Sequence, residues 1–179
     1  DDVDIYDAGT DSWSSTSLTV PRTLVAATAV GDLALFAGGI GATGATDVID
    51  VFDTQTMTLG PTASLSQARF GVAATTVGNK ALFAGGSISG GGGVQATVDV
   101  YDASLGAPDD PLAWSVESLS LARSDITAVT VGDLAIFAGG NGPQGVPYDR
   151  VDIYDGSTGL WSQATLSVAR TLGADAAAA

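Results

Sequence analysis

The chain has 179 residues, of which 45% are hydrophobic and 15% are charged, so we expect a packed core and not a disordered segment. Twenty acidic residues against six Lys and Arg give a net charge of −14, which makes nucleic acid and anionic membrane surfaces poor candidates for partners. The sequence contains no Cys and no His, which excludes disulfides and thiolate or imidazole metal sites, and no apolar run approaches the roughly 18 residues of a membrane span, so no membrane insertion is expected.

The first segment, residues 1–17, is expected to be the end of a structural unit. Its run 3–7 reads Val-Asp-Ile-Tyr-Asp, and Trp13 follows seven residues after Tyr6. Alternation of apolar and polar residues over such a short run is typical of a β-strand. We therefore expect this segment to supply two strands.

Residues 18–64 form the first complete unit, called here the first repeat. Gly31 and Asp32 suit a tight hairpin turn between its first two strands. Those two strands are apolar on both faces, so both faces must be covered by other parts of the protein. Four short strands are expected, near 23–30, 33–37, 48–52 and 57–63.

The same elements recur in the second repeat, residues 65–118, and in the third repeat, residues 119–166. In each repeat an Arg precedes a Gly pair by sixteen residues, and a later strand carries a central Asp between apolar residues. An insertion, 106–111, separates the last two strands of the second repeat, and residues 167–179 are expected to begin a further unit. Constant spacing within units and variable loops between strands are typical of a stacked β-repeat.

A Gly pair after an apolar strand, then a Tyr, then a Trp about seven residues later resembles the pattern of the kelch-repeat family, and the resemblance covers nearly the whole chain. It implies an all-β, kelch-type β-propeller with four-stranded antiparallel blades. The partial ring would hold three full blades, the three repeats, and two partial ones at 1–17 and 167–179. Intact members imply about five to seven blades, so further blades are expected from missing residues or from a partner. Phe52 and Leu59 depart from the Tyr and Trp of the pattern.

The repeated arginines are the first candidate site. The resemblance implies a cationic ring near the axis that receives an acidic ligand. The other interpretation is structural, with each Arg paired to an Asp or bound to carbonyl groups between blades. Equal spacing in every repeat favours the structural interpretation, because a ligand rarely needs the same residue in each blade. The four residues are Arg22, Arg69, Arg123 and Arg170.

The loops that follow the Gly pairs are the second candidate site, because they vary in length and content on a repeated scaffold. They span 40–46, 87–97 and 141–150 and are expected on the same face as the loops that carry the arginines. The third of these loops is stiffened by prolines. Tyr148 and Arg150 are therefore its candidate binding residues.

The sequence favours a non-catalytic module for protein–protein interaction or structural scaffolding, with other protein subunits as partners. The alternative is a carbohydrate-binding or sugar-isomerising kelch propeller, similar to bacterial sialate epimerases, which would need only Arg and carboxylates and would bind a glycan. Copper oxidases on this scaffold need His and Cys, and neither is present. No catalytic residue, cofactor or metal site is predicted, and the sequence indicates no cellular compartment.

Overall fold

The computed structural model describes residues 1–89 and 93–171. Within these residues almost all regular structure is antiparallel β-strand, and the helical segments are two short 3₁₀ turns, η1 (Pro111–Ala113) and η2 (Pro143–Gly145). The prediction of an all-β chain made of small antiparallel sheets is confirmed. None of the described helical segments is long and apolar enough to cross a membrane.

The second and third repeats each form a four-stranded sheet in which chain neighbours are sheet neighbours. The second sheet runs β10 (Ala73–Val77), β11 (Lys80–Ala84), β12 (Thr97–Asp102) and β13 (Trp114–Ser118). The third runs β14 (Thr127–Val131), β15 (Leu134–Ala138), β16 (Arg150–Asp155) and β17 (Leu160–Thr165).

The first repeat forms a similar sheet whose last strand is divided. The pieces β8 and β9 both pair with β7, because Gly60 and Pro61 lie between them and a proline has no N–H for the ladder. The first strand is also shorter than expected, since Leu24 adopts a positive φ of 55° before it. The strands are β3 (Ala26–Val30), β4 (Leu33–Ala37), β7 (Val48–Asp53), β8 (Thr58–Leu59) and β9 (Ala63–Ser64).

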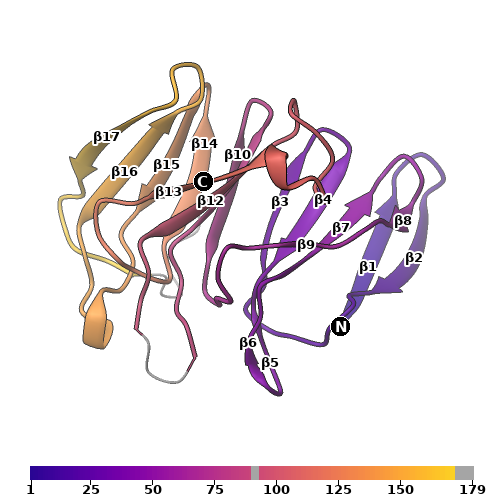
Figure 1. The fold of residues 1–179 in the computed structure, drawn as a ribbon, viewed down its shortest axis with the longest axis horizontal. Helices are drawn as coiled ribbons and strands as arrows, with labels where there is room; N and C mark the ends of the chain where they lie inside the picture. Colours follow the sequence, from indigo (N-terminus) through magenta and orange to yellow (C-terminus); the bar gives the residue numbers. More distant parts are fainter. Residues whose placement is uncertain (90–92, 172–179) are drawn as a thin grey trace.

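Two smaller pairs complete the described strands. The sheet at the N-terminal end contains β1 (Asp2–Asp7) and β2 (Ser12–Ser17), as expected for residues 1–17. A short hairpin of β5 (Ile40–Gly41) and β6 (Gly44–Ala45) lies in the loop after the first Gly pair. In Figure 1 this hairpin and η2 lie at the lower edge of the molecule, and η1 lies at the upper edge.

The sheets stand side by side, and the first strands of successive sheets, β3, β10 and β14, are neighbours in space (Figure 1). Their contact is close because these strands carry small residues such as Ala and Thr. The hydroxyl groups of Thr28 and Thr76 lie 2.8 Å apart, and those of Thr75 and Thr130 are also 2.8 Å apart. Each pair joins two sheets.

The core lies between facing sheets and falls into two clusters, one between the first and second repeats and one between the second and third. Large aromatic residues on the third and fourth strands of the second and third sheets fill these spaces. The rings of Tyr101 and Trp114 are 5.2 Å apart, and those of Tyr154 and Trp161 are 5.1 Å apart. Both Tyr residues are buried.

Candidate functional site

Three of the four repeated arginines form buried ion pairs within their own repeats. Each pairs with the central Asp of its third strand, and no side chain in these pairs is more than 3% exposed. The Nη2–Oδ2 distance is 2.7 Å in the first repeat and 2.5 Å in the third. The pairs are Arg22–Asp50, Arg69–Asp99 and Arg123–Asp152.

The guanidinium groups of Arg69 and Arg123 also bind backbone carbonyls at the end of the second strand and the start of the third, and that of Arg22 binds the carbonyls of Val20 and Phe36. Arg123 Nη1 donates to the carbonyl oxygens of Gly139 and Arg150, each at 2.6 Å, and its Nη2 donates to that of Phe137 at 3.1 Å. In the second repeat the corresponding acceptors of Arg69 are Gly85 and Thr97. Each guanidinium therefore joins three parts of one repeat.

Burial lowers the pKa of Arg69 and Arg123, and the carboxylates of Asp99 and Asp152 oppose this shift. Arginine keeps its charge in proteins, so these are charged pairs enclosed by protein. A ligand approaching from solvent meets neither partner. This arrangement favours the structural interpretation of Arg22, Arg69 and Arg123 over the ligand-binding one.

The second oxygen of each paired Asp holds the segment that leads into the first strand. Asp99 Oδ1 accepts a hydrogen bond from the Ser66 backbone N–H at 2.9 Å, three residues before Arg69. Equivalent bonds run from Thr19 to Asp50 and from Ser120 to Asp152, each at 3.1 Å. Each Asp thus fixes its Arg and the backbone that positions it.

The Gly pairs are required by close contact with the next repeat. A Cβ placed on Gly85 would lie 2.4 Å from the carbonyl oxygen of Arg123, and Gly85 has a φ of +67°. The Gly86 N–H donates to the same oxygen at 3.0 Å. The arginine therefore serves its own repeat through its side chain and the preceding repeat through its backbone.

Arg170 differs from the other three arginines. Its carbonyl accepts the Gly140 N–H at 2.9 Å, as the repeat requires, but its side chain is exposed. Its Nε donates to the Val168 carbonyl at 3.4 Å, and it makes no ion pair with a described residue. Of the further unit predicted at 167–179, only residues 167–171 are among the described residues.

Tyr148, in the loop before β16, and Arg150, the first residue of β16, are both half-buried. The Tyr148 ring lies directly against Gly142, where an added Cβ would be 2.4 Å from Cζ. Arg150 donates from Nη1 to Gln163 Oε1 at 3.0 Å, and its positive charge contributes to the lowered pKa of Arg123. Both remain candidate binding residues, although the structure gives each an intramolecular contact.

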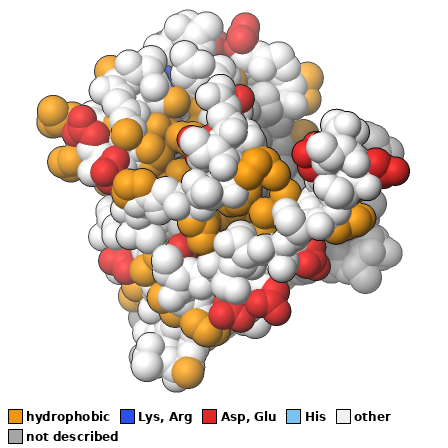
Figure 2. Space-filling model, turned by 90° about the vertical axis from the view of Figure 1, so that its right-hand side faces the viewer, with side chains coloured by type: hydrophobic (Ala, Val, Ile, Leu, Met, Phe, Trp, Pro, Cys, Tyr) orange, Lys and Arg blue, Asp and Glu red, His pale blue; other side chains and the backbone are white. Residues whose placement is uncertain are grey.

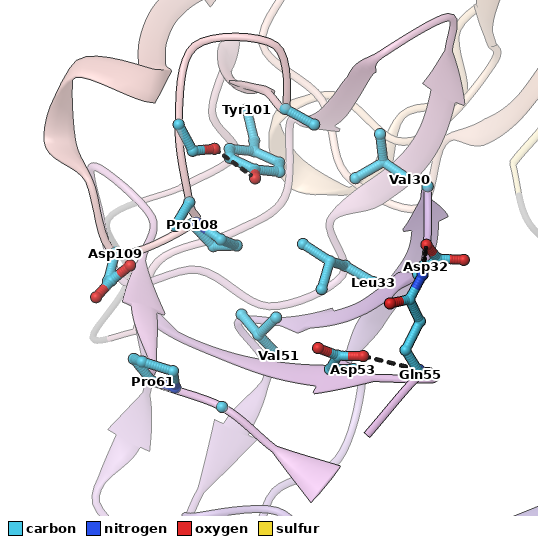
Figure 3. Close-up of a pocket in the computed structure, with 15 residues that line it drawn as sticks. Val30, Asp32, Leu33, Val51, Asp53, Gln55, Pro61, Tyr101, Pro108 and Asp109 are labelled. Atoms are coloured by element: carbon cyan, nitrogen blue, oxygen red, sulfur yellow. Dashed lines mark hydrogen bonds between the residues drawn. The ribbon is translucent and has the colours of Figure 1, made fainter. Parts of the chain in front are cut away.

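A cleft of about 510 Å³ opens between the first sheet and the inserted loop of the second repeat. In Figure 3 the side chains of Leu33 and Val51 face Tyr101 and Pro108 across it. Three carboxylates lie around it and no Lys or Arg lines it; they belong to Asp32, Asp53 and Asp109.

Sequence reasoning identified the insertion 106–111 but did not connect it with a cleft. The insertion supplies Gly106, Pro108 and Asp109 to one wall. The opposite wall comes from strands of another repeat, and their proximity depends on how the two sheets face each other. The length of the insertion was the only feature of the sequence that could have indicated a cleft.

No group of three or more potential metal ligands comes together in residues 1–89 and 93–171. In the third repeat the side chain of Arg123 donates to the backbone carbonyls of Gly139, Arg150 and Phe137 and to Asp152.

Comparisons with known proteins show the fold of the chain alone. No family model and no curated protein matches it. The solved structure of YjhT is similar, with a TM-score of 0.69 and 16% sequence identity over 87% of this chain and 56% of the YjhT chain. The match thus spans little more than half of YjhT. The class defined by fold and site is an all-β protein of small, facing antiparallel sheets.

Proposed function

We propose that this chain is a segment of a kelch-type β-propeller that acts as a non-catalytic protein-interaction or structural scaffold module within a larger protein or assembly. The recurring Arg, Gly-pair and Tyr–Trp positions support the kelch assignment. The contact between the first strands β3, β10 and β14 is what a radial arrangement of blades requires.

The observation that carries the functional proposal is the contrast between buried polar groups and an exposed aromatic pair. Arg22, Arg69 and Arg123 are buried inside the fold, whereas Tyr6 is 50% exposed and Trp13 is 71% exposed. The corresponding Tyr101 and Tyr154 are 1% and 3% exposed, because another sheet covers them. The β1–β2 sheet therefore presents a surface of the kind that sheets in this protein bury.

Figure 2 views the molecule from the side on which β1 and β2 lie in Figure 1. Hydrophobic side chains gather on this face with acidic side chains around them. Apolar surface with a polar rim is typical of protein interfaces. Its partner would be an apolar protein surface, supplied by another subunit or another sheet of the same assembly.

Sedimentation velocity over a wide range of protein concentrations tests this proposal. We expect concentration-dependent association that Trp13→Ser weakens, and the matched control Leu112→Ser, which removes a residue 80% exposed on η1, should leave it unchanged. Association that is insensitive to Trp13→Ser would contradict the role of this face. Saturable binding of a glycan that is lost in Tyr148→Ala or Arg150→Ala would instead favour the carbohydrate-binding alternative.

A further inference from the structure

The strongest unexplained feature is a difference between two equivalent positions, Lys80 and Leu33. In the second repeat Lys80 lies opposite Asp102 in the β11–β12 register, and its Nζ donates to Asp102 Oδ2. The hydrogen bond to Asp102 is the main cause that raises the Lys80 pKa, and the nearby Tyr154 and Glu117 add to it. An ammonium group is thus held between the second and third sheets.

The first repeat keeps the acceptor of this arrangement but not its lysine. Leu33 lies opposite Asp53 in the β4–β7 register, where the second repeat has Lys80 and Asp102. Tyr101 of the following sheet occupies the position that Tyr154 has beside Lys80. The pair of facing sheets therefore contains the same carboxylate and the same aromatic ring without an internal cation.

The two carboxylates divide their hydrogen bonds in the same way. Asp102 Oδ1 accepts from the Ser104 N–H at 3.0 Å, which leaves Oδ2 for Lys80. Asp53 Oδ1 accepts from the backbone N–H groups of Gln55 at 2.7 Å and Thr56 at 3.1 Å. Asp53 Oδ2 accepts no hydrogen bond from a described residue, and in Figure 3 it points toward the side of Val51.

The cleft opens at this position. Leu33 is shorter than lysine, and the inserted loop places Pro108 across from it, so apolar walls lead to the Asp53 carboxylate (Figure 3). Asp32 and Asp109 lie on opposite sides of the cleft and add negative charge, and no lining residue is basic. An alkyl chain that ends in a cation complements this combination of apolar walls and anionic groups.

We propose that this cleft binds a lysine side chain of a partner protein, with its ammonium group on Asp53 Oδ2 and its alkyl chain against Leu33, Val51 and Pro108. The partner lysine takes the position that Lys80 occupies in the next repeat. The cleft, at about 510 Å³, also has room for residues that flank the lysine. The inference rests on the proposed interaction function and gives it a specific contact.

NMR titration of the ¹⁵N-labelled chain with the peptide acetyl-Leu-Lys-Leu-amide tests the proposal. We expect saturable shifts in the amides of Leu33, Asp53 and Tyr101. The peptide with norleucine in place of lysine has nearly the same shape without the charge, and it should bind at least tenfold more weakly.

Two variants locate the site. Leu33→Lys supplies an internal ammonium as the second repeat does, so it should reduce peptide affinity at least tenfold while the spectrum elsewhere shows an intact fold. Asp53→Asn should also weaken binding. The matched control Asp155→Asn, at the equivalent position opposite Leu134 in the third repeat, should leave it unchanged.

Equal affinity for the norleucine peptide, or unchanged binding to Leu33→Lys, would overturn the proposal. Hexylamine that binds as tightly as the peptide would overturn the assignment to a partner protein and indicate a small amine as ligand. These outcomes are separate from the Trp13→Ser test, because Trp13 lies on β2 and does not line the cleft. Failure here would leave an association through the β1–β2 face intact.

Discussion

Arg69 and Asp99 lie 30 positions apart in the chain and form an ion pair in which neither side chain is more than 3% exposed. The pair connects the segment before the first strand of the second repeat to the centre of the third strand of that repeat. Because both groups are removed from water, the loss of either partner leaves the other as an uncompensated buried charge, which destabilises the fold.

Replacement of Arg69 with Met should therefore destabilise the fold strongly. The Asp99 carboxylate would remain buried without a counter-charge, and we expect a loss of about 3–5 kcal/mol in the free energy of unfolding, measured by urea denaturation. Arg170→Met is the matched control, since Arg170 is exposed, and it should change the free energy by less than about 0.5 kcal/mol. Similar losses for the two variants would contradict the structural role of the buried pair.

The Gly pair offers a second comparison. Gly85 and Gly78 both have positive φ, 67° and 56°, so Ala at either position carries a strain of about 1–2 kcal/mol. A Cβ on Gly85 would also meet the Arg123 carbonyl, whereas nothing lies within 4 Å of one on Gly78. Gly85→Ala should lower the thermal unfolding midpoint clearly more than Gly78→Ala, and equal shifts would show that backbone strain alone matters.

The hydroxyl of Thr130 links the third sheet to the second. It donates to the Thr76 carbonyl at 2.7 Å and accepts from Thr75. Thr130→Val keeps the shape but removes both bonds and should cost about 1 kcal/mol. In a double-mutant cycle, adding Thr75→Val should cost less than it does in the wild-type chain, because the Thr75 hydroxyl has already lost its partner; strict additivity would argue against this contact.

The Lys80–Asp102 pair predicts a pH dependence. Burial opposes ionisation of Asp102, but its hydrogen bonds with Lys80 and Ser104 outweigh burial and lower its pKa, while the pKa of Lys80 is raised. Because its pKa is lowered, the Asp102 carboxylate stabilises the fold above the unfolded pKa of about 3.9. This stabilisation is lost as pH falls through the folded pKa. Because its pKa is raised, the Lys80 ammonium stabilises the fold below the unfolded pKa of about 10.4. This stabilisation is lost as pH rises through the folded pKa.

Lys80→Met should consequently lower the urea midpoint at pH 7, and the difference from wild type should shrink below about pH 4 and again above about pH 10.4. The measurement is a series of urea unfolding curves across this range for both proteins. A difference that stays constant with pH would mean that Lys80 contributes through packing and not through its charge.

Much of the strand pattern could be predicted because it depends on local sequence. In the first repeat the second strand, Leu33–Ala37, is observed where the apolar run predicts it, and the third strand, Val48–Asp53, is one residue longer than predicted. The predicted fourth strand is divided at Pro61, and the first begins after Leu24. Both differences arise from single backbone positions, and a pattern shared by all the repeats does not reveal them.

The environment of the arginines could be predicted only in part. Their equal spacing favoured a structural role, but the Asp partners lie about 30 residues away, and the carbonyl acceptors belong to two further segments. The cleft could not be predicted at all, because the significance of Leu33 depends on which residues of the next sheet face it. Such contacts depend on how whole sheets pack and not on spacing along the chain.

The double use of Arg69 and Arg123 has a consequence for how the molecule unfolds. Arg123 holds its own repeat with its guanidinium and receives the Gly86 N–H of the preceding repeat on its carbonyl. Fraying of one repeat would therefore remove an acceptor from its neighbour, and we expect local unfolding to spread between adjacent repeats. We expect this nearest-neighbour coupling to make the row of sheets unfold more cooperatively than sheets that did not share these hydrogen bonds.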